Sequence, residues 1–232
     1  MNGFYAIAID GPSGAGKSSQ AKRLAKAFGF IYVDTGAIYR TLGLACLRAG
    51  TDRRDTGAVM QVLEGLDIAF RYNEAGEQYM LLNGEDVSRE IRQPEVSIAA
   101  SDVSAIPEVR TFLLEMQRRF ARENNVIMDG RDIGTVVLPE AELKIFLTAS
   151  PEARAKRRLA EMREKGIAGD FEEVLKDINY RDAQDSGRAA APLRCAEDAV
   201  LVDTSDIGFD ESFALLCELV ITRLAIRPEE IQ

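Results

Sequence analysis

A glycine-rich stretch near the start of the chain has the residue types and the spacing that hold phosphate groups. Its members are Gly11, Pro12, Ser13, Gly14, Ala15, Gly16, Lys17 and Ser18, which fit the pattern G-x-x-x-x-G-K-[ST]. Glycines allow backbone N–H groups to turn toward a phosphate because no Cβ stands in the way. Lys17 is expected to reach the β- and γ-phosphates of a nucleoside triphosphate, and the Ser18 hydroxyl is expected to ligate Mg²⁺.

The elements on either side of this stretch are those that position such a loop. The apolar run 4–9 predicts a buried strand, and the helical periodicity of 18–28, with Gly29 as a stop signal, predicts a helix. The amino terminus of that helix would add a partial positive charge behind the phosphate. A glycine-rich turn between a core strand and a core helix is the alternative. The order strand, loop, helix favours triphosphate binding.

Polar residues also follow the second predicted strand, 30–33, at its carboxyl end. They run from Asp34 and Thr35 to Tyr39 and Arg40, at the edge of an open α/β sheet where ligands bind. Arg40 lies within one helical turn of Tyr39 and could point at a second anion. Thr35 has an alternative role as the N-cap of the helix that begins here.

A third predicted strand, 126–129, ends in Asp129 and is followed by a predicted loop, 130–134. In a protein with a phosphate-binding loop, a strand-terminal aspartate suggests the Walker-B role, in which the carboxylate holds the water shell of the metal. The alternative is an Asp-Gly turn that Arg131 stabilises. The glycine-rich stretch favours the metal role, because it supplies the phosphates that the same metal would bridge.

Three arginines share one face of a later predicted helix. Arg154, Arg157 and Arg158 stand at positions i, i+3 and i+4 of the helix that Ser150 and Pro151 begin. In a phosphoryl-transfer enzyme, such a helix would be a mobile lid that places positive charge on the transferring group and excludes water. Glutamates on the same helix leave open the alternative of an ordinary solvated face.

The remaining periodicity predicts an α/β fold. Further strands are expected at 143–147 and 199–203, and further helices at 95–105, 107–122, 171–183 and from a cap at Asp210 to about 225. The alternation predicts a parallel sheet of about five strands flanked by helices, as in P-loop NTPases. Residues 68–72 and 78–82, with a turn at 73–76 and a tight turn at 83–84, predict an antiparallel β insertion.

Composition narrows the possible functions. The 232 residues are 46% apolar and 29% charged, which is typical of a soluble globular protein. No apolar run is long enough for a membrane span, and the first residues lack the layout of a signal peptide. The three widely spaced cysteines fit neither a disulfide framework nor a zinc site, so we expect a cytoplasmic protein. The net charge of −9 argues against nucleic-acid binding, and the absence of histidine excludes imidazole catalysis.

Taken together, the motifs resemble those of the bacterial cytidylate kinases, which are P-loop nucleoside monophosphate kinases. The resemblance covers nearly the whole chain. The segments that carry it occur in family order and are 11–17, 34–40, 129–134, Arg181-Asp182, Asp185-Ser186, Arg188, Pro192-Leu193, Asp198-Ala199 and 203–205. One departure is Ser18-Ser19, where many relatives have Gly-Thr. Ser18 stays the favoured metal ligand because of the general motif.

The resemblance implies transfer of the γ-phosphoryl group of ATP, with Mg²⁺, to CMP or dCMP, within pyrimidine nucleotide metabolism. It also implies a core of residues 1–65, 95–149 and 185–232, a nucleotide-monophosphate-binding insertion of residues 66–94 and a lid of residues 150–184. The acceptor is a phosphate oxygen that is already ionised, so no general base is needed. A monomer is the default expectation, with ATP and CMP or dCMP as the only partners.

The resemblance also assigns residues. Arg40, Arg131 and Arg181 would hold the acceptor's phosphate. The cytosine would be surrounded by Thr35, Arg110, Asp132 and Arg188. Asp185 would contact the sugar, with Tyr39 and Asp129 completing the acceptor set. ATP would contact residues 11–18, Ser19, Arg154 and Arg157, and the charge on the transferring group would be neutralised by Lys17, Arg131, Arg157 and Arg158.

Two kinds of alternative remain open. A kinase of another small acceptor, such as UMP, dTMP or shikimate, would use the same scaffold. A nucleotide-dependent switch such as a GTPase belongs to a different class, and it would need a guanine-reading Asn-Lys-x-Asp segment, which the sequence lacks.

Overall fold

The chain forms two compact units. The structure, a computed structural model, describes residues 3–74, 76–164 and 166–227. Residues up to Ile31 and from Asn124 onward form the first unit, here called the discontinuous unit, and Tyr32–Glu123 form the second, the continuous unit. Within the discontinuous unit, the backbone N–H of Ile31 donates to the carbonyl of Asn125 at 2.8 Å. The chain therefore leaves this unit and returns to it through neighbouring residues.

A five-stranded parallel sheet carries the phosphate loop, as predicted. Its strands are β1 (Ala6–Asp10), β2 (Ile31–Asp34), β6 (Val126–Gly130), β7 (Leu143–Thr148) and β8 (Val200–Asp203), in the order β2-β6-β1-β7-β8. Strand β1 pairs in parallel with both β6 and β7, and Ile7, Ile9 and Ile127 are fully buried. Apolar runs buried on both faces are typical of parallel sheets, so the predicted strands are confirmed.

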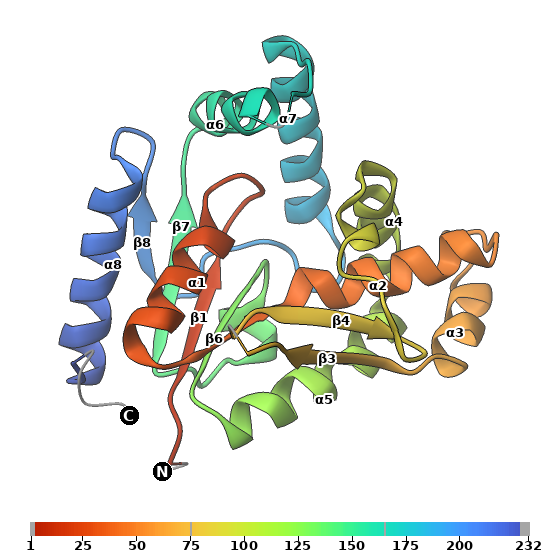
Figure 1. The fold of residues 1–232 in the computed structure, drawn as a ribbon, viewed down its shortest axis with the longest axis horizontal. Helices are drawn as coiled ribbons and strands as arrows, with labels where there is room; N and C mark the ends of the chain where they lie inside the picture. Colours follow the sequence, from red (N-terminus) through yellow and green to blue (C-terminus); the bar gives the residue numbers. More distant parts are fainter. Residues whose placement is uncertain (1–2, 75, 165, 228–232) are drawn as a thin grey trace. The chain divides into compact units, whose positions relative to one another are not determined.

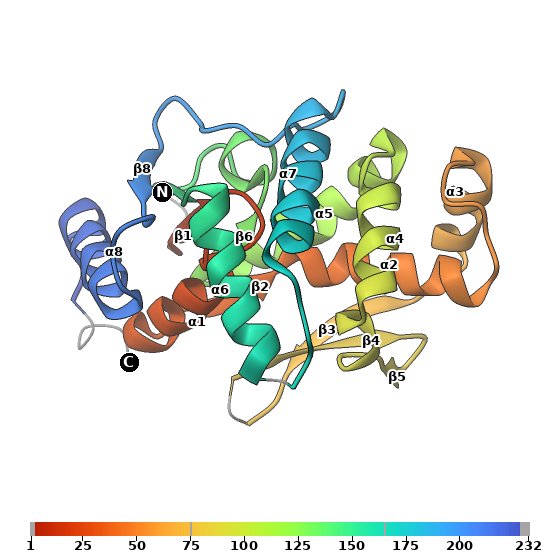
Figure 2. The same cartoon turned by 90° about the horizontal axis from the view of Figure 1, so that it is seen from above.

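Helices cover this sheet within the discontinuous unit (Figures 1 and 2). They are α1 (Lys17–Phe28), α6 (Pro151–Glu164), α7 (Phe171–Gly187), α8 (Phe209–Leu224) and the short π-helix η2 (Ile133–Val137). Helix α1 ends as predicted at Gly29, which is left-handed at φ 67° and donates its N–H to the carbonyl of Ala25. Helices α1 and α8 pack together, because the amide of Gln20 donates to the Phe209 carbonyl at 2.8 Å and to Ser212 Oγ at 2.6 Å.

Three local expectations were wrong. Asp34, not Thr35, is the N-cap of the next helix, because its carboxylate accepts the Ala37 N–H at 2.9 Å while Thr35 is already helical and buried. Helix α8 begins at Phe209 after Gly208, so Asp210 lies in the first turn and pairs with Arg23 at 2.5 Å instead of capping. The expected loop at 130–134 turns into η2 from residue 133 onward.

The continuous unit has its own core and its own sheet. Its elements are α2 (Thr35–Arg48), α3 (Thr56–Glu64), β3 (Ile68–Tyr72), β4 (Gln78–Leu82), β5 (Glu85–Asp86), η1 (Glu90–Arg92), α4 (Pro94–Ser104) and α5 (Pro107–Glu123). Strands β3, β4 and β5 form an antiparallel sheet, and the predicted turn between β4 and β5 has positive φ at Asn83 and Gly84. Helix α3 was not predicted. Asp55 caps it by accepting the Ala58 N–H at 3.0 Å.

Helices α2 and α4 approach closely at Gly43, which gives a first prediction. A Cβ at Gly43 would lie 2.8 Å from the Ala100 backbone nitrogen, so Gly43→Ala forces the two helices apart. We expect a loss of about 1–3 kcal/mol in the free energy of unfolding, measured by urea denaturation. The matched control is Gly187→Ala in α7, where no atom lies within 4 Å of the new methyl group. That change should be neutral or stabilising, and equal effects at both glycines would contradict the packing argument.

Within the described ranges, no helix is both long and apolar enough to cross a membrane.

Candidate active site

The glycine-rich loop between β1 and α1 has a backbone that only glycine accommodates at its first position. Gly11 has φ 147°, and a Cβ there would lie 1.9 Å from the Leu147 carbonyl oxygen. Gly14 and Gly16 also have positive φ, at 78° and 88°. The loop therefore follows a path that leaves its backbone N–H groups available to an anion, as the motif predicts.

Lys17 is folded back into this loop. Its side chain is 5% exposed, and its Nζ donates to the Pro12 carbonyl at 2.8 Å. Burial lowers the pKa of Lys17 to about 7, and the nearby charge of Arg131 lowers it further, while Asp129 and Asp10 act in the opposite direction. A polyphosphate would stabilise the ammonium form, so binding of an anion to the loop favours the charged lysine.

The residues beside the loop suit a magnesium ion. The Ser18 hydroxyl donates to Asp129 Oδ2 at 2.6 Å, so the two hard oxygen donors that the sequence predicted do lie together. Among residues 3–74, 76–164 and 166–227, no group of three or more His, Cys, Asp or Glu side chains forms a complete protein cage for a metal. Mg²⁺ commonly takes one or two protein ligands and completes its shell with phosphates and water, so this pair fits it.

Asp10, at the end of β1, was missed from the sequence. Its two carboxylate oxygens accept the backbone N–H groups of Ile133 and Gly134, both at 2.7 Å. Burial raises the pKa of Asp10 to about 6, although both N–H donors act to lower it. The carboxylate thereby fixes the start of η2, directly after Arg131 and Asp132. An acidic residue ending a buried strand was the available signal.

A second charged cluster joins three of the predicted acceptor residues. Asp185, on α7, accepts from Arg131 Nε at 2.5 Å and from Arg188 Nη2 at 2.6 Å. Burial would raise the pKa of Asp185, but the two guanidiniums outweigh it and hold the pKa below its usual value. Arg181 lies near this cluster, since desolvation and the charges of Arg158 and Arg131 lower its pKa. Cations exceed anions here, which favours a negatively charged ligand.

The three arginines of α6 do not share one environment. Arg154 is 2% exposed and donates to the carbonyls of Ala149 and Ser13, at 2.9 and 3.0 Å, and to Asp182 at 2.5 Å. Arg157 donates to the hydroxyl and carbonyl oxygens of Thr204. Arg158 is exposed and lies 3.5 Å from Glu161. One face of the helix does carry all three residues, but only the last guanidinium is turned to solvent.

This difference predicts separable effects of two arginine substitutions. Arg154→Ala removes a buried guanidinium and leaves Asp182 and two carbonyls without it, so we expect a loss of about 3 kcal/mol in the free energy of unfolding. Arg158→Ala should leave the thermal midpoint unchanged, because its pair with Glu161 is exposed. Calorimetry of both variants checks this. Equal midpoints would show that the buried contacts of Arg154 contribute nothing to the fold.

The continuous unit holds the other predicted acceptor residues. Arg40 Nη2 donates to Asp34 Oδ2 at 2.8 Å, while Arg40 Nε is buried without a hydrogen-bond partner in the part of the chain that the structure describes. The Arg110 guanidinium lies 5.4 Å from the centre of the Tyr39 ring and donates to the Ser104 carbonyl at 3.1 Å. Thr35 occupies the first turn of α2. This unit therefore also presents guanidinium groups that could bind an anion.

The fold and the loop together define a P-loop nucleotide-binding protein of the phosphotransferase type. A fold likeness supports the architecture: the crystal structure of an uncharacterized protein from Eubacterium ventriosum superposes with a TM-score of 0.52 at 12% identity, covering 94% of this chain and 99% of that chain.

The particular family follows from the sequence comparisons. The cytidylate kinase family model matches residues 7–222. The cytidylate kinase of Caldicellulosiruptor saccharolyticus is 51% identical over 213 residues, covering 92% of this chain and 94% of the relative. The cytidylate kinase of Pasteurella multocida is 44% identical over 227 residues, covering 98% of this chain and all of the relative. The chain therefore belongs to the cytidylate kinase family.

Proposed function

We propose that this protein transfers the γ-phosphoryl group of ATP to CMP or dCMP, giving ADP and CDP or dCDP. The observation that carries the proposal is the full-length match to relatives named cytidylate kinases, at 51% and 44% identity. The geometry of the loop supports it, because a buried lysine beside a glycine-rich backbone suits a polyphosphate. The chain would act in pyrimidine nucleotide metabolism, in the cytoplasm, as a monomer.

The proposed chemistry needs alignment and charge neutralisation. The acceptor oxygen is already ionised, so a chain without histidine lacks nothing that the transfer requires. Lys17 would neutralise charge on the β- and γ-phosphates, with Arg131, Arg157 and Arg158 on the transferring group. Ser18 would hold Mg²⁺ together with Asp129, with Ser19 as the second candidate hydroxyl. When bound, the ion would supply positive charge to the phosphate oxygens.

Each unit would contribute its own share of the acceptor-binding residues. In the discontinuous unit these are Asp129, Arg131, Asp132, Arg181, Asp185 and Arg188. In the continuous unit they are Thr35, Tyr39, Arg40 and Arg110. Backbone N–H groups of 11–19, with Arg154 and Arg157, would bind ATP. We further propose that residues 66–94 serve the nucleoside monophosphate and that residues 150–184 act as the lid.

The proposal is tested with a coupled assay of ADP release. MgATP is offered with CMP, dCMP, UMP, dTMP and shikimate in parallel, and MgGTP replaces MgATP in a second series. We expect fast turnover with CMP and dCMP. Faster turnover with UMP, dTMP or shikimate than with CMP would replace the acceptor assignment. Selective GTP hydrolysis without phosphorylation of any acceptor would replace the kinase assignment itself.

A further inference from the structure

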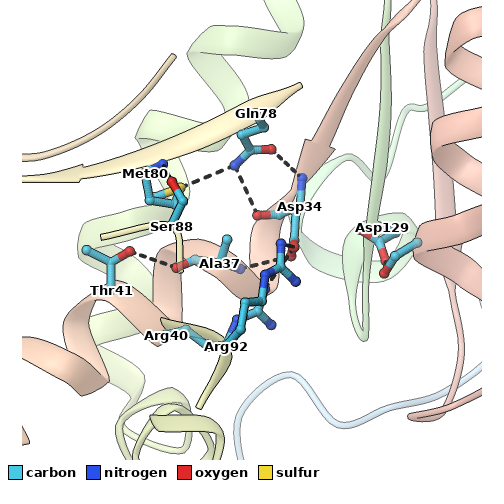
Figure 3. Close-up of polar contacts among 10 residues, drawn as sticks. Asp34, Ala37, Arg40, Thr41, Gln78, Met80, Ser88, Arg92 and Asp129 are labelled. Carbon is cyan, nitrogen blue, oxygen red and sulfur yellow. Dashed lines mark hydrogen bonds and ion pairs between the residues drawn. The ribbon is translucent and has the colours of Figure 1, made fainter. Parts of the chain in front are cut away.

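Asp34, at the end of β2, holds two guanidinium groups on one carboxylate oxygen. Its Oδ2 accepts from Arg40 Nη2 at 2.8 Å and from Arg92 Nη2 at 3.1 Å, and its Oδ1 accepts the Ala37 N–H at 2.9 Å (Figure 3). Burial would raise the pKa of Asp34, but Arg40 and Arg92 outweigh it and lower the pKa. The carboxylate is thus charged, and it fixes an arginine from α2 beside an arginine from η1.

Gln78, on β4, in turn fixes the backbone of Asp34. Its Oε1 accepts the Asp34 N–H at 2.7 Å, and its Nε2 faces the Asp34 carbonyl at 3.4 Å and the Met80 sulfur at 3.3 Å (Figure 3). The side-chain amide therefore offers an acceptor and a donor to the last residue of β2, much as a neighbouring strand would. Through this one side chain, the antiparallel sheet contacts the residue that orients Arg40 and Arg92.

The cluster carries more positive than negative charge. One carboxylate faces two guanidiniums, so a net positive charge remains at the amino terminus of α2. Arg40 Nε is a buried donor that no described protein atom satisfies, and the Arg92 side chain is 55% exposed. Buried donors without partners are uncommon in folded proteins, and an anion such as a phosphate would satisfy this one.

We propose that Asp34 and Gln78 are positioning residues for the phosphate of the acceptor nucleotide, and that Arg92 is a second guanidinium for that phosphate beside Arg40. This inference rests on the proposed function. Asp34 acts by holding both guanidiniums in one place, so that little side-chain entropy is lost when the phosphate binds. Gln78 acts through Asp34, which gives the antiparallel sheet a direct part in acceptor affinity.

The first test separates the KM for CMP from the KM for ATP. Gln78→Ala removes the 2.7 Å bond to the Asp34 N–H, and we expect the KM for CMP to rise about tenfold, with the KM for ATP within about twofold of wild type. Gln78→Glu keeps an acceptor at that N–H and should recover part of the affinity. Gln61→Ala, at an exposed glutamine in α3, is the matched control and should behave as wild type.

A double variant then distinguishes positioning from a merely structural role. If Gln78 acts through the arginines, Gln78→Ala should change kcat/KM for CMP little when Arg40→Ala is already present. Full additivity of the two losses would overturn the inference. So would a wild-type KM for CMP in Gln78→Ala, with the kinase function intact. Failure of the wild-type protein itself to phosphorylate CMP would overturn the proposed function and the inference with it.

Discussion

Replacing Lys17 by methionine is expected to lower kcat by about 10³-fold. The lysine Nζ now rests on the Pro12 carbonyl, and it is the buried cation of the glycine-rich loop. A positioned donor aimed at developing charge in a site shielded from water typically contributes 10²–10³ in rate. Methionine fills a similar volume without the charge, so the loss would come from electrostatics and not from a cavity.

The same substitution should stabilise the protein without ligand. The pKa of Lys17 falls from 10.5 to about 7 on folding, so the unfolded chain binds more protons between these pH values. Stability of the wild type should therefore rise as the pH increases from about 7 to 10. Lys17→Met lacks this dependence, and near neutral pH we expect a thermal midpoint on the order of 5 °C higher than wild type.

Calorimetry across this pH range and steady-state assays with CMP measure both effects. Lys26→Met, at an exposed lysine in the last turn of α1, is the control for loss of charge alone. A variant at Lys17 that is less stable than wild type at pH 7 would contradict the account of its burial. Wild-type turnover in that variant would contradict its role in the transfer.

Asp132→Asn is expected to lower the preference for CMP over UMP by roughly 10³–10⁴-fold. Asp132 is 5% exposed, directly before η2. A buried carboxylate can accept from the N4 amino group of cytosine, whereas uracil presents an oxygen there and leaves the carboxylate unpaired. Sites that read a hydrogen-bonding group in this way discriminate by 10⁴ or more. An asparagine amide could donate to the uracil oxygen instead.

The measurement is the ratio of kcat/KM for CMP and UMP in the wild type and in the variant. Asp206→Asn, at an exposed aspartate, controls for the loss of one negative charge on the surface. Both acceptors losing activity equally in Asp132→Asn would show that this carboxylate does not read the base. In that case its role would be to support η2.

Strong local patterns allowed most of the fold to be predicted. The glycine-rich loop, the buried strands and the β3–β4–β5 sheet each have a signal within a few residues, so their positions are close to those expected. Helix α3 was missed because Thr56 and Gly57 are poor helix formers, and its start depends on the cap at Asp55. The placement of Asp129 beside Ser18 followed from parallel strands ending at one edge.

Contacts between residues distant in sequence could not be predicted. Arg154, Arg157 and Arg158 have one helical spacing, yet their surroundings are set by Asp182, Thr204 and the Ser13 carbonyl. Asp10 and Gln78 act through backbone groups more than forty residues away. A backbone partner leaves no residue-type signal, because every amino acid except proline offers the same N–H group.

The return of the chain at Asn125 to the neighbour of Ile31 has a consequence for synthesis on the ribosome. Strand β1 pairs with β6 and β7, which emerge from the exit tunnel more than a hundred residues later. The continuous unit, Tyr32–Glu123, is by contrast complete before β6 has been translated. Because domains generally fold as units during translation, the segment in the middle of the chain should fold first. The nascent first strand and phosphate loop must then wait for their partners, which makes the amino-terminal thirty residues the part most dependent on protection from aggregation.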